Sequence, residues 1–130
     1  TDSDPSSVRE SKKEVVKACK NAAGNQKGSF NNQLAAFLYG ENDIIVAPGY
    51  ANLNAKAMAD IYGVSKGSEK KVKGGLEGRF GDRVRYLIAD DIGHAWGGGK
   101  DTSGGFVEDS DINFGLYLGE FFTNNNQRAK

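Results

Sequence analysis

The sequence contains very few of the residues on which most metal and disulfide sites depend. Its 130 residues include one cysteine, Cys19, and one histidine, His94. A single cysteine excludes a disulfide within the chain and a metal site built from several cysteines. A single histidine excludes most zinc sites. We therefore expect no metal and no other cofactor, and any chemistry of the chain must depend on few side chains.

An excess of positive charge and long hydrophobic runs are also lacking. The 17 lysines and arginines are balanced by 17 aspartates and glutamates. Nucleic acids and anionic membranes bind proteins through an excess of basic side chains, so neither is expected as a partner. No hydrophobic run approaches the roughly 18 residues of a transmembrane helix, and no signal-peptide pattern is visible. We expect no transmembrane segment.

Glycine, in contrast, is abundant, and the start of the sequence is unusual. The 18 glycines are about twice the usual share. The sequence begins at Thr1 without a methionine, as a processed chain does. Processing from a longer precursor and removal of a tag or signal sequence both explain this start. We expect one unit over residues 1–130, with residues 1–6 disordered and residues 124–130 forming a tail.

The hydrophobic pattern alternates between amphipathic helices and short apolar strands. Ser7 and Glu10 have the spacing of a capping box, which predicts a helix that starts near Val8. Two short apolar runs, at residues 33–39 and 83–89, are typical of buried parallel strands. The expected elements are helices at residues 8–23, 50–62 and 110–122, the last capped by Asp109 or Ser110, strands at 33–39 and 83–89, and a polar connection at 63–82 with room for a hairpin.

This order of elements predicts the α/β class, in which helices cover a mainly parallel sheet. Two strands are too few for such a sheet to stand alone with both faces covered. We therefore expect an incomplete fold unit that another segment or chain completes.

His94 is the most informative residue for function. It follows the strand at 83–89, on a loop with glycine on both sides. Ligands of open α/β sheets collect at such strand ends, and glycine allows the backbone to turn sharply. Asp43 lies after the other strand and is a natural companion, because an aspartate that accepts from His Nδ1–H orients a general base. The alternative is a surface histidine and a turn aspartate. Trp96 would form an aromatic wall beside His94 or belong to the core.

Two segments resemble the C-terminal part of the polyhydroxybutyrate depolymerase and feruloyl-esterase-like α/β-hydrolases. They are LYGENDIIV at residues 38–46 and IGHAWGGG at residues 92–99. In that family a triad aspartate lies in a His-Gly-x-x-Asp-x-x-Val segment and the triad histidine in Gly-x-Gly-His-Ala-Trp-x-Gly-Gly. The resemblance extends over about residues 33–122. It implies that Asp43 and His94 take the places of the triad aspartate and histidine, and that Trp96 lines the substrate side.

The chain departs from the family pattern at three points. Tyr39 stands where histidine is usual, and Asp91 stands where the first glycine is usual. The third departure is the nucleophile, since the family order is Ser, Asp, His, with the serine on a Gly-x-Ser-x-Gly elbow between a strand and a helix. Nothing before Asp43 fits this pattern. Ser65 has the right flanking glycines, but it follows a helix and lies between Asp43 and His94.

The leading hypothesis is therefore the C-terminal segment of a serine α/β-hydrolase. The resemblance implies ester hydrolysis, with a polyester of the polyhydroxyalkanoate type as one candidate substrate. The partner would be an N-terminal segment or chain of the same hydrolase that carries the serine. The family is commonly secreted, so a secreted or periplasmic location is expected. The alternative is a stand-alone, non-catalytic α/β binding or interaction domain.

Overall fold

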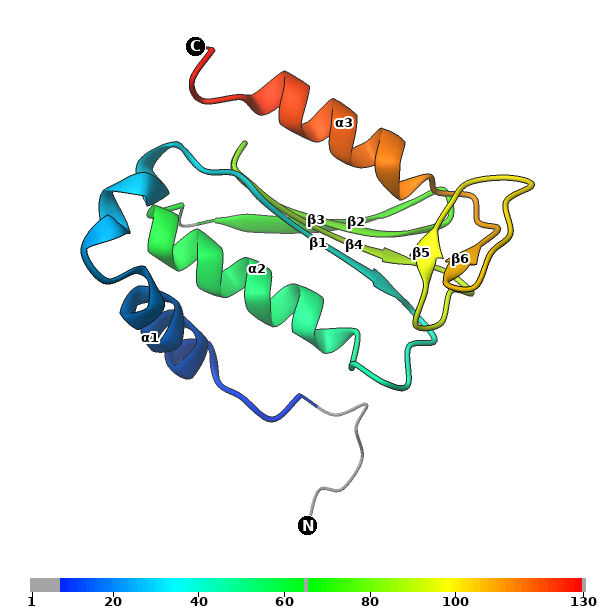
Figure 1. Cartoon of the computed structure of the whole chain (residues 1–130), viewed down its shortest axis with the longest axis horizontal. Coiled ribbons are helices and arrows are strands. Elements are labelled where there is room, and N and C mark those ends of the chain that lie inside the picture. Colours follow the sequence, from blue (N-terminus) through cyan, green and yellow to red (C-terminus); the bar gives the residue numbers. More distant parts are fainter. Residues whose placement is uncertain (1–7, 65, 130) are drawn as a thin grey trace.

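The computed structural model describes residues 8–64 and 66–129, which form a four-stranded sheet with helices on both faces (Figure 1). α2 covers one face, α3 covers the other, and α1 packs against α2. The helices are α1 (Lys12–Ala23), α2 (Gly49–Tyr62) and α3 (Phe114–Asn125), with a 3-10 helix, η1 (Gly24–Asn32), after α1. The main sheet contains β1 (Ala35–Gly40), β2 (Gly67–Val72), β3 (Gly75–Phe80) and β4 (Val84–Ala89), and β5 (Trp96–Gly97) pairs separately with β6 (Val107–Glu108).

The sheet combines a parallel and an antiparallel half. Its strand order is β1-β4-β3-β2. β1 and β4 run parallel over their full lengths, which confirms the two predicted parallel strands and the α/β class. β2 and β3 form a hairpin that joins β4 antiparallel, so the sheet is mixed and not purely parallel. The tight turn at Gly74, with φ 84°, leaves no room for the crossover that a parallel connection needs.

Strand alternation divides the side chains of β1 between two hydrophobic cores. On one face, Phe37 and Tyr39 pack with a core that contains the buried alanines of α2. On the other face, Leu38 packs with the core that contains Leu87 of β4 and Phe114 of α3. Because β1 and β4 are parallel, their carboxyl ends lie at the same edge of the sheet. The loops that follow these two strands are therefore neighbours.

α1 begins at Lys12 and not near Val8, so the predicted start is wrong. The hydroxyl of Ser11 accepts from the N–H of Glu14 at 3.2 Å, and the Glu14 carboxylate accepts from the N–H of Ser11 at 2.7 Å. The Ser-x-x-Glu spacing occurs twice in this region, and the second occurrence makes the capping box. Ser7 lies outside the described residues.

α3 also begins later than predicted, at Phe114, and neither Asp109 nor Ser110 caps it. The cap is Asn113, whose side-chain oxygen accepts from a backbone N–H of the first turn at 3.0 Å. Ser110 instead fixes the preceding loop, because its backbone N–H donates to the carbonyl of Gly99 at 3.1 Å. Serine and asparagine both bond to nearby backbone, and here the asparagine next to the helix takes the capping role.

The structure tests only some of the remaining predictions about chain organisation. α3 continues to Asn125, past the predicted helix end at Phe122. The stretch predicted as disordered, residues 1–6, lies outside the described residues. No helix in the described part of the chain combines the length and the hydrophobicity needed to cross a membrane. Cys19 is a half-buried free thiol on α1.

Candidate functional site

Hydrogen bonds join the loops after β1 and β4 at the carboxyl edge of the sheet. The N–H of Glu41 donates to the carbonyl of Ala89 at 2.8 Å, and the N–H of Asn42 donates to the carbonyl of Ile92 at 2.8 Å. The N–H of Asp91 donates to the Glu41 carboxylate at 3.3 Å. These bonds fix one loop against the other, so the side chains that follow them are held at a defined separation.

Asp43 is held by the backbone of its own loop. Its side chain is 7% exposed, and its Oδ1 accepts from the N–H groups of Ile45 at 2.8 Å and Val46 at 2.9 Å. An aspartate that accepts from the N–H two residues later forms an Asx turn, which fixes the rotamer of the carboxylate. The other oxygen, Oδ2, is therefore aimed in one direction.

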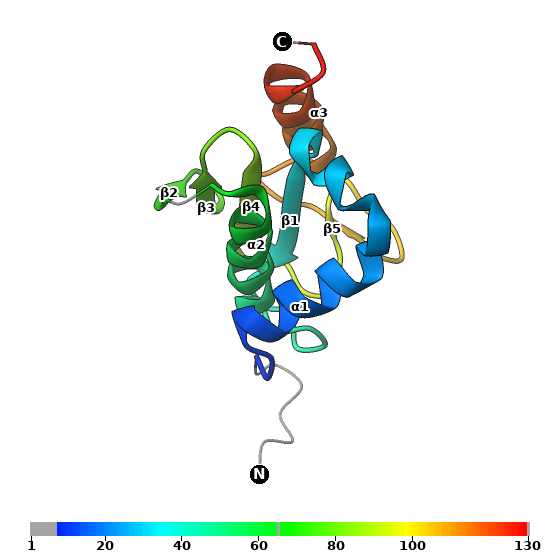
Figure 2. The same ribbon diagram turned by 90° about the vertical axis from the view of Figure 1, so that its left-hand side faces the viewer.

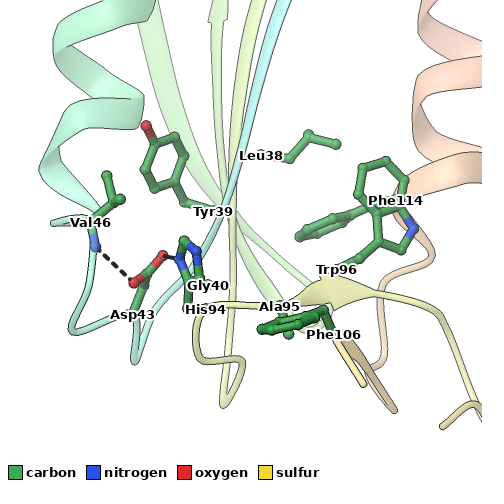
Figure 3. Close-up of a pocket in the computed structure, with 10 residues that line it drawn as sticks. All are labelled: Leu38, Tyr39, Gly40, Asp43, Val46, His94, Ala95, Trp96, Phe106 and Phe114. Carbon is green, nitrogen blue, oxygen red and sulfur yellow. Dashed lines mark hydrogen bonds and ion pairs between the residues drawn. The ribbon is translucent and has the colours of Figure 1, made fainter. Parts of the chain in front are cut away.

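That second oxygen contacts the histidine from the neighbouring loop. Asp43 Oδ2 lies 3.0 Å from His94 Nδ1, although the two residues are 51 positions apart in the sequence (Figure 3). An ionised carboxylate can only accept, so Nδ1 carries the proton in this pair. In the neutral imidazole Nε2 is then the unprotonated nitrogen. The structure thus brings together the two residues that the sequence singled out, in the geometry of an oriented general base.

The surroundings of Asp43 favour its charged form. Burial raises the pKa of this carboxyl, but the N–H of Val46, the ring of His94 and the N–H of Ile45 all bond to the carboxylate and outweigh burial. The net effect is a pKa below the ordinary value of 3.8. Asp43 is therefore a stable anion at neutral pH, as a group that orients a histidine needs to be.

This lowered pKa predicts how stability depends on acid. A carboxyl with a lower pKa in the folded state stabilises the fold above its unfolded-state pKa, and this contribution is lost as pH falls through the folded-state value. We expect the difference in unfolding free energy between wild type and Asp43→Asn to shrink as the pH falls below about 3.8. Urea unfolding at a series of pH values measures this. A difference that stays constant down to pH 2.5 contradicts the lowered pKa.

His94 stands at the mouth of an open cavity. Its side chain is 51% exposed. The backbone turns sharply around it, since the N–H of Ala95 donates to the carbonyl of Gly93 at 2.9 Å. This turn uses the glycine that the sequence places directly before the histidine. The imidazole is accordingly bonded on one side and accessible on the other, which suits a group that exchanges protons with a bound molecule.

The cavity is mostly apolar and has a volume of about 480 Å³. Figure 3 places Asp43 and His94 on one side and the aromatic rings of Trp96, Phe106 and Phe114 on the other. A volume of this size accommodates a small organic ligand. The lining residues are Leu38, Tyr39, Gly40, Asp43, Val46, His94, Ala95, Trp96, Phe106 and Phe114.

Trp96 forms part of the aromatic side of this cavity. Its ring packs edge-on against Phe114, with ring centroids 5.4 Å apart, and the side chain remains 44% exposed. The backbone N–H of Trp96 donates to the carbonyl of Phe106 at 2.7 Å, in the short β5–β6 ladder. Trp96 thus packs on the core through one edge and offers the rest of its ring to the cavity.

Several cavity residues escaped the sequence analysis. Phe106 is 74% exposed and lies in a glycine-rich loop without a periodic hydrophobic pattern. Phe114 is the first residue of α3, a helix that the sequence predicts to begin earlier, at residue 110. Gly40 ends β1 at a close approach: an added Cβ would lie 2.3 Å from the carbonyl oxygens of Ile92 and Gly93. The glycine at the end of an apolar strand was the signal that could have revealed this contact.

Two of the three departures from the family pattern, Asp91 and Tyr39, have simple structural settings. Asp91 has φ 60°, a left-handed conformation that suits glycine and that aspartate tolerates better than most residues. Tyr39 lines the cavity, and burial raises the pKa of its hydroxyl above the ordinary value, so the phenol stays neutral at pH 7. The hydrogen bonds that the structure describes for the side chains of Asp43 and His94 involve neither Asp91 nor Tyr39.

The cavity lacks a nucleophile from the part of the chain that the structure describes. No serine, threonine or cysteine is among the residues that line it. Ser65, which has the flanking glycines of the elbow pattern, lies outside the described residues. Within residues 8–64 and 66–129, no cluster of three or more histidine, cysteine or acidic side chains could hold a metal ion. What the described residues provide is a half-exposed histidine bonded to a buried carboxylate, beside an apolar wall.

Comparison with known proteins supports the resemblance expected from these segments. No protein-family model matches the sequence. The chain is similar to the poly(3-hydroxybutyrate) depolymerase of Ralstonia pickettii, with 29% identity over an alignment that covers 85% of the chain. The chain spans about 25% of the length of that relative. The predicted resemblance to polyhydroxybutyrate depolymerases is thus confirmed, and this similarity supports a hydrolase-related origin of the chain.

Proposed function

We propose that the chain supplies the aspartate and the histidine of a Ser-His-Asp triad for ester hydrolysis, in a hydrolase of the polyhydroxybutyrate depolymerase type. The observation that carries the proposal is the 3.0 Å contact between Asp43 Oδ2 and His94 Nδ1, at the carboxyl ends of adjacent parallel strands. The serine would lie on an N-terminal segment of the same hydrolase. The depolymerase that the chain resembles is about four times as long as the part that the chain matches, so it contains further segments that could carry a serine. A secreted or periplasmic location is part of the same proposal.

The proposed chemistry begins with acylation. The serine hydroxyl attacks the ester carbonyl while His94 Nε2 takes its proton. Asp43 stays ionised and stabilises the imidazolium through Nδ1–H. The tetrahedral intermediate then collapses, the bond to the leaving alcohol breaks, and His94 returns the proton to that alcohol. The products of this half are the free alcohol and an acyl-serine.

Deacylation repeats the same proton transfers with water. His94 Nε2 takes a proton from water as its oxygen attacks the acyl carbonyl, and then returns it to the serine oxygen. The net reaction is ester plus water to carboxylic acid plus alcohol, with no other reactant. Both halves need one side of the imidazole bonded and the other accessible, and His94 has both.

The lining of the cavity favours an apolar acyl group. The aromatic rings of Trp96, Phe106 and Phe114 lie opposite His94 (Figure 3), and Leu38 and Val46 add aliphatic surface. A short hydroxyacyl unit of a polyester has mainly apolar carbon beside each ester group. We therefore propose a polyester of the polyhydroxyalkanoate type as the substrate class, with Trp96 on the acyl side.

This role of Trp96 gives a testable expectation in the complete hydrolase. Trp96→Ala should lower kcat/KM for a butyryl ester by about tenfold, because roughly 1–2 kcal/mol of apolar contact is lost. The loss should be smaller for an acetyl ester, whose acyl chain reaches less of the ring. Trp96→Phe, which keeps an aromatic ring against Phe114, is the matched control. Equal losses for the two esters would place the acyl group elsewhere.

A chimera tests the proposed function directly. The matched quarter of the Ralstonia pickettii depolymerase is replaced by this chain, and hydrolysis of a nitrophenyl butyrate ester is measured. We expect an active enzyme, because the replaced part would contribute the same two triad residues. A folded chimera without esterase activity would favour the alternative, a non-catalytic α/β binding domain. Circular dichroism and thermal unfolding of the chimera separate this outcome from misfolding.

A further inference from the structure

We propose that a pocket under the C-terminal half of α3 is a second binding site, for a short monocarboxylic acid, and that Arg85 holds its carboxylate. This inference does not rest on the function proposed above. The pocket has a volume of about 280 Å³ and is lined by residues of β3, β4 and α3. Arg85 is the second residue of β4, whereas His94 follows the other end of that strand. Figure 2 views the molecule from the end where β4 begins, with α3 at the top.

Arg85 is unusual because it is a charged side chain inside the fold. It is only 6% exposed, and a buried charge is costly unless other groups compensate it. It also lies directly opposite Arg79 in the β3–β4 register, and like charges in such a pair destabilise a sheet. A residue that breaks two rules of stability in one place is a candidate for a binding role.

The carboxylate nearest to these two arginines is already occupied. Arg79 donates through Nε to Glu77 Oε1 at 2.7 Å, and the hydroxyl of Tyr117 donates to Glu77 Oε2 at 2.8 Å. Among residues 8–64 and 66–129, no carboxylate forms an ion pair with Arg85. Burial and the nearby Arg79 lower the pKa of the Arg85 guanidinium, so its surroundings do not balance its charge. An anion in the pocket would supply that balance.

The protein uses only one of the three guanidinium nitrogens of Arg85. Nη1 donates to the carbonyls of Gly81 at 2.5 Å and Val84 at 2.9 Å. In the described part of the chain, no side-chain nitrogen or oxygen that is sealed from solvent lacks a hydrogen-bond partner. Nε and Nη2 of Arg85 have no such partner there, so these two nitrogens are open to the pocket that Arg85 lines.

The two open nitrogens define the chemistry of the ligand. The N–H groups of Nε and Nη2 lie on one edge of the planar guanidinium and point in parallel, which is the geometry that binds both oxygens of a carboxylate. The guanidinium carbon lies 5.1 Å from the centroid of the Phe121 ring, and Nη1 is fixed by its two carbonyls. This edge is therefore held in place before a ligand arrives, which lowers the cost of binding.

The size and the charge of the pocket restrict the ligand further. A volume of about 280 Å³ admits an acid of a few carbon atoms. The pocket is lined by three acidic and two basic residues, so a monoanion meets less repulsion than a dianion such as sulfate. One of the acidic residues, Glu120, is exposed and accepts hydrogen bonds. A hydroxyl group on the ligand would donate to it, which favours a hydroxy acid.

NMR titration of the isotope-labelled chain with 3-hydroxybutyrate tests this site through the Nε–H signal of Arg85. We expect the signal to shift to saturation with a Kd of about 1 mM, an affinity suited to a ligand with few atoms. Butyrate lacks the hydroxyl and should bind about threefold more weakly. Sulfate should bind about tenfold more weakly or worse. An Arg85 signal that stays in place up to about 100 mM ligand would overturn the inference, as would equal affinity for sulfate.

A conservative variant tests the role of the guanidinium. Arg85→Lys keeps the charge but removes the paired N–H groups, so it should weaken binding of 3-hydroxybutyrate by about tenfold or more. Arg128→Lys is the matched control, because it makes the same exchange at an exposed arginine that does not line the pocket. Its Kd should stay within about twofold of wild type. Unchanged binding in folded Arg85→Lys would overturn the inference. If this variant does not fold, the titration of the wild-type chain decides alone.

Two further titrations separate this site from the cavity at His94 and from the rest of the hydrolase. The Arg85 signal should shift with the same Kd in His94→Ala, and a lost response there would overturn the independent site. In the chimera the signal should also respond. A signal that no longer responds would mean that another segment fills the pocket, and this too would overturn the inference. An inactive chimera whose Arg85 still binds the acid would count against the triad and support this site.

Discussion

Replacing His94 by alanine in the chimeric hydrolase should lower kcat for ester hydrolysis by about 10⁴-fold or more, because removing the base of a triad leaves only binding and oxyanion stabilisation. The fold should survive, since the imidazole is half-exposed and its hydrogen bond is to Asp43. Asp43→Asn should lower kcat by a similar order, about 10⁴-fold, since an amide no longer holds the productive tautomer. Steady-state kinetics and thermal unfolding measure both effects.

A matched control for this prediction lies outside the cavity. Lys100 forms an exposed ion pair with Asp111 at 2.7 Å and does not line the cavity. Lys100→Ala removes a charged side chain from a neighbouring loop without touching the proposed triad, and exposed ion pairs contribute little to stability. Its activity should stay within about twofold of the unsubstituted chimera. Retention of activity in His94→Ala would disprove the triad assignment.

Gly40→Ala should damage both the fold and the site. The new Cβ would lie 2.3 Å from the carbonyl oxygens of Ile92 and Gly93, and backbone atoms cannot move aside as a flexible side chain can. The displaced backbone leads directly to His94. We expect unfolding free energy to fall by about 2 kcal/mol and kcat/KM of the chimera to fall by about a hundredfold, the cost of a misplacement of about 1 Å.

The control for Gly40 is a glycine with free space around it. A Cβ at Gly119, in α3, would meet no atom within 4 Å. Gly119→Ala should raise the stability by up to about 1 kcal/mol, since alanine favours the helix, and leave activity unchanged. Chemical unfolding of both variants makes the comparison. If Gly40→Ala were as stable as wild type, the two loops would not be in the close contact described.

The parts of the site that depend on local sequence were predictable. Asp43 and His94 each follow an apolar strand, and the glycines on both sides of His94 predict a turn that exposes the imidazole. Parallel strands end at one edge, and the structure makes these two strands neighbours, so their loops meet. Strand prediction therefore made this pairing a candidate and the family resemblance favoured it, while the 3.0 Å distance required the structure.

The parts that depend on choices between equivalent local signals were not predictable. Two Ser-x-x-Glu patterns compete for the start of α1, and nothing in the local sequence distinguishes the one at Ser11, which makes the capping box, from the one at Ser7. The polar residues before α3 contain several possible caps, and only the loop contacts of Ser110 decide between them. Phe106 reaches the cavity through the β5–β6 ladder, whose strands are two residues each and leave no periodic signal.

Labelling with a fluorophosphonate probe tests the central claim most directly. The assembly that contains this chain is isolated from its natural source, treated with the probe and digested, and the labelled peptide is sequenced. We predict one labelled serine, within a Gly-x-Ser-x-Gly peptide from a segment outside residues 8–129, because His94 would activate a serine that another segment supplies. An assembly without any labelled serine would contradict the claim, since Asp43 and His94 would then have no nucleophile to activate.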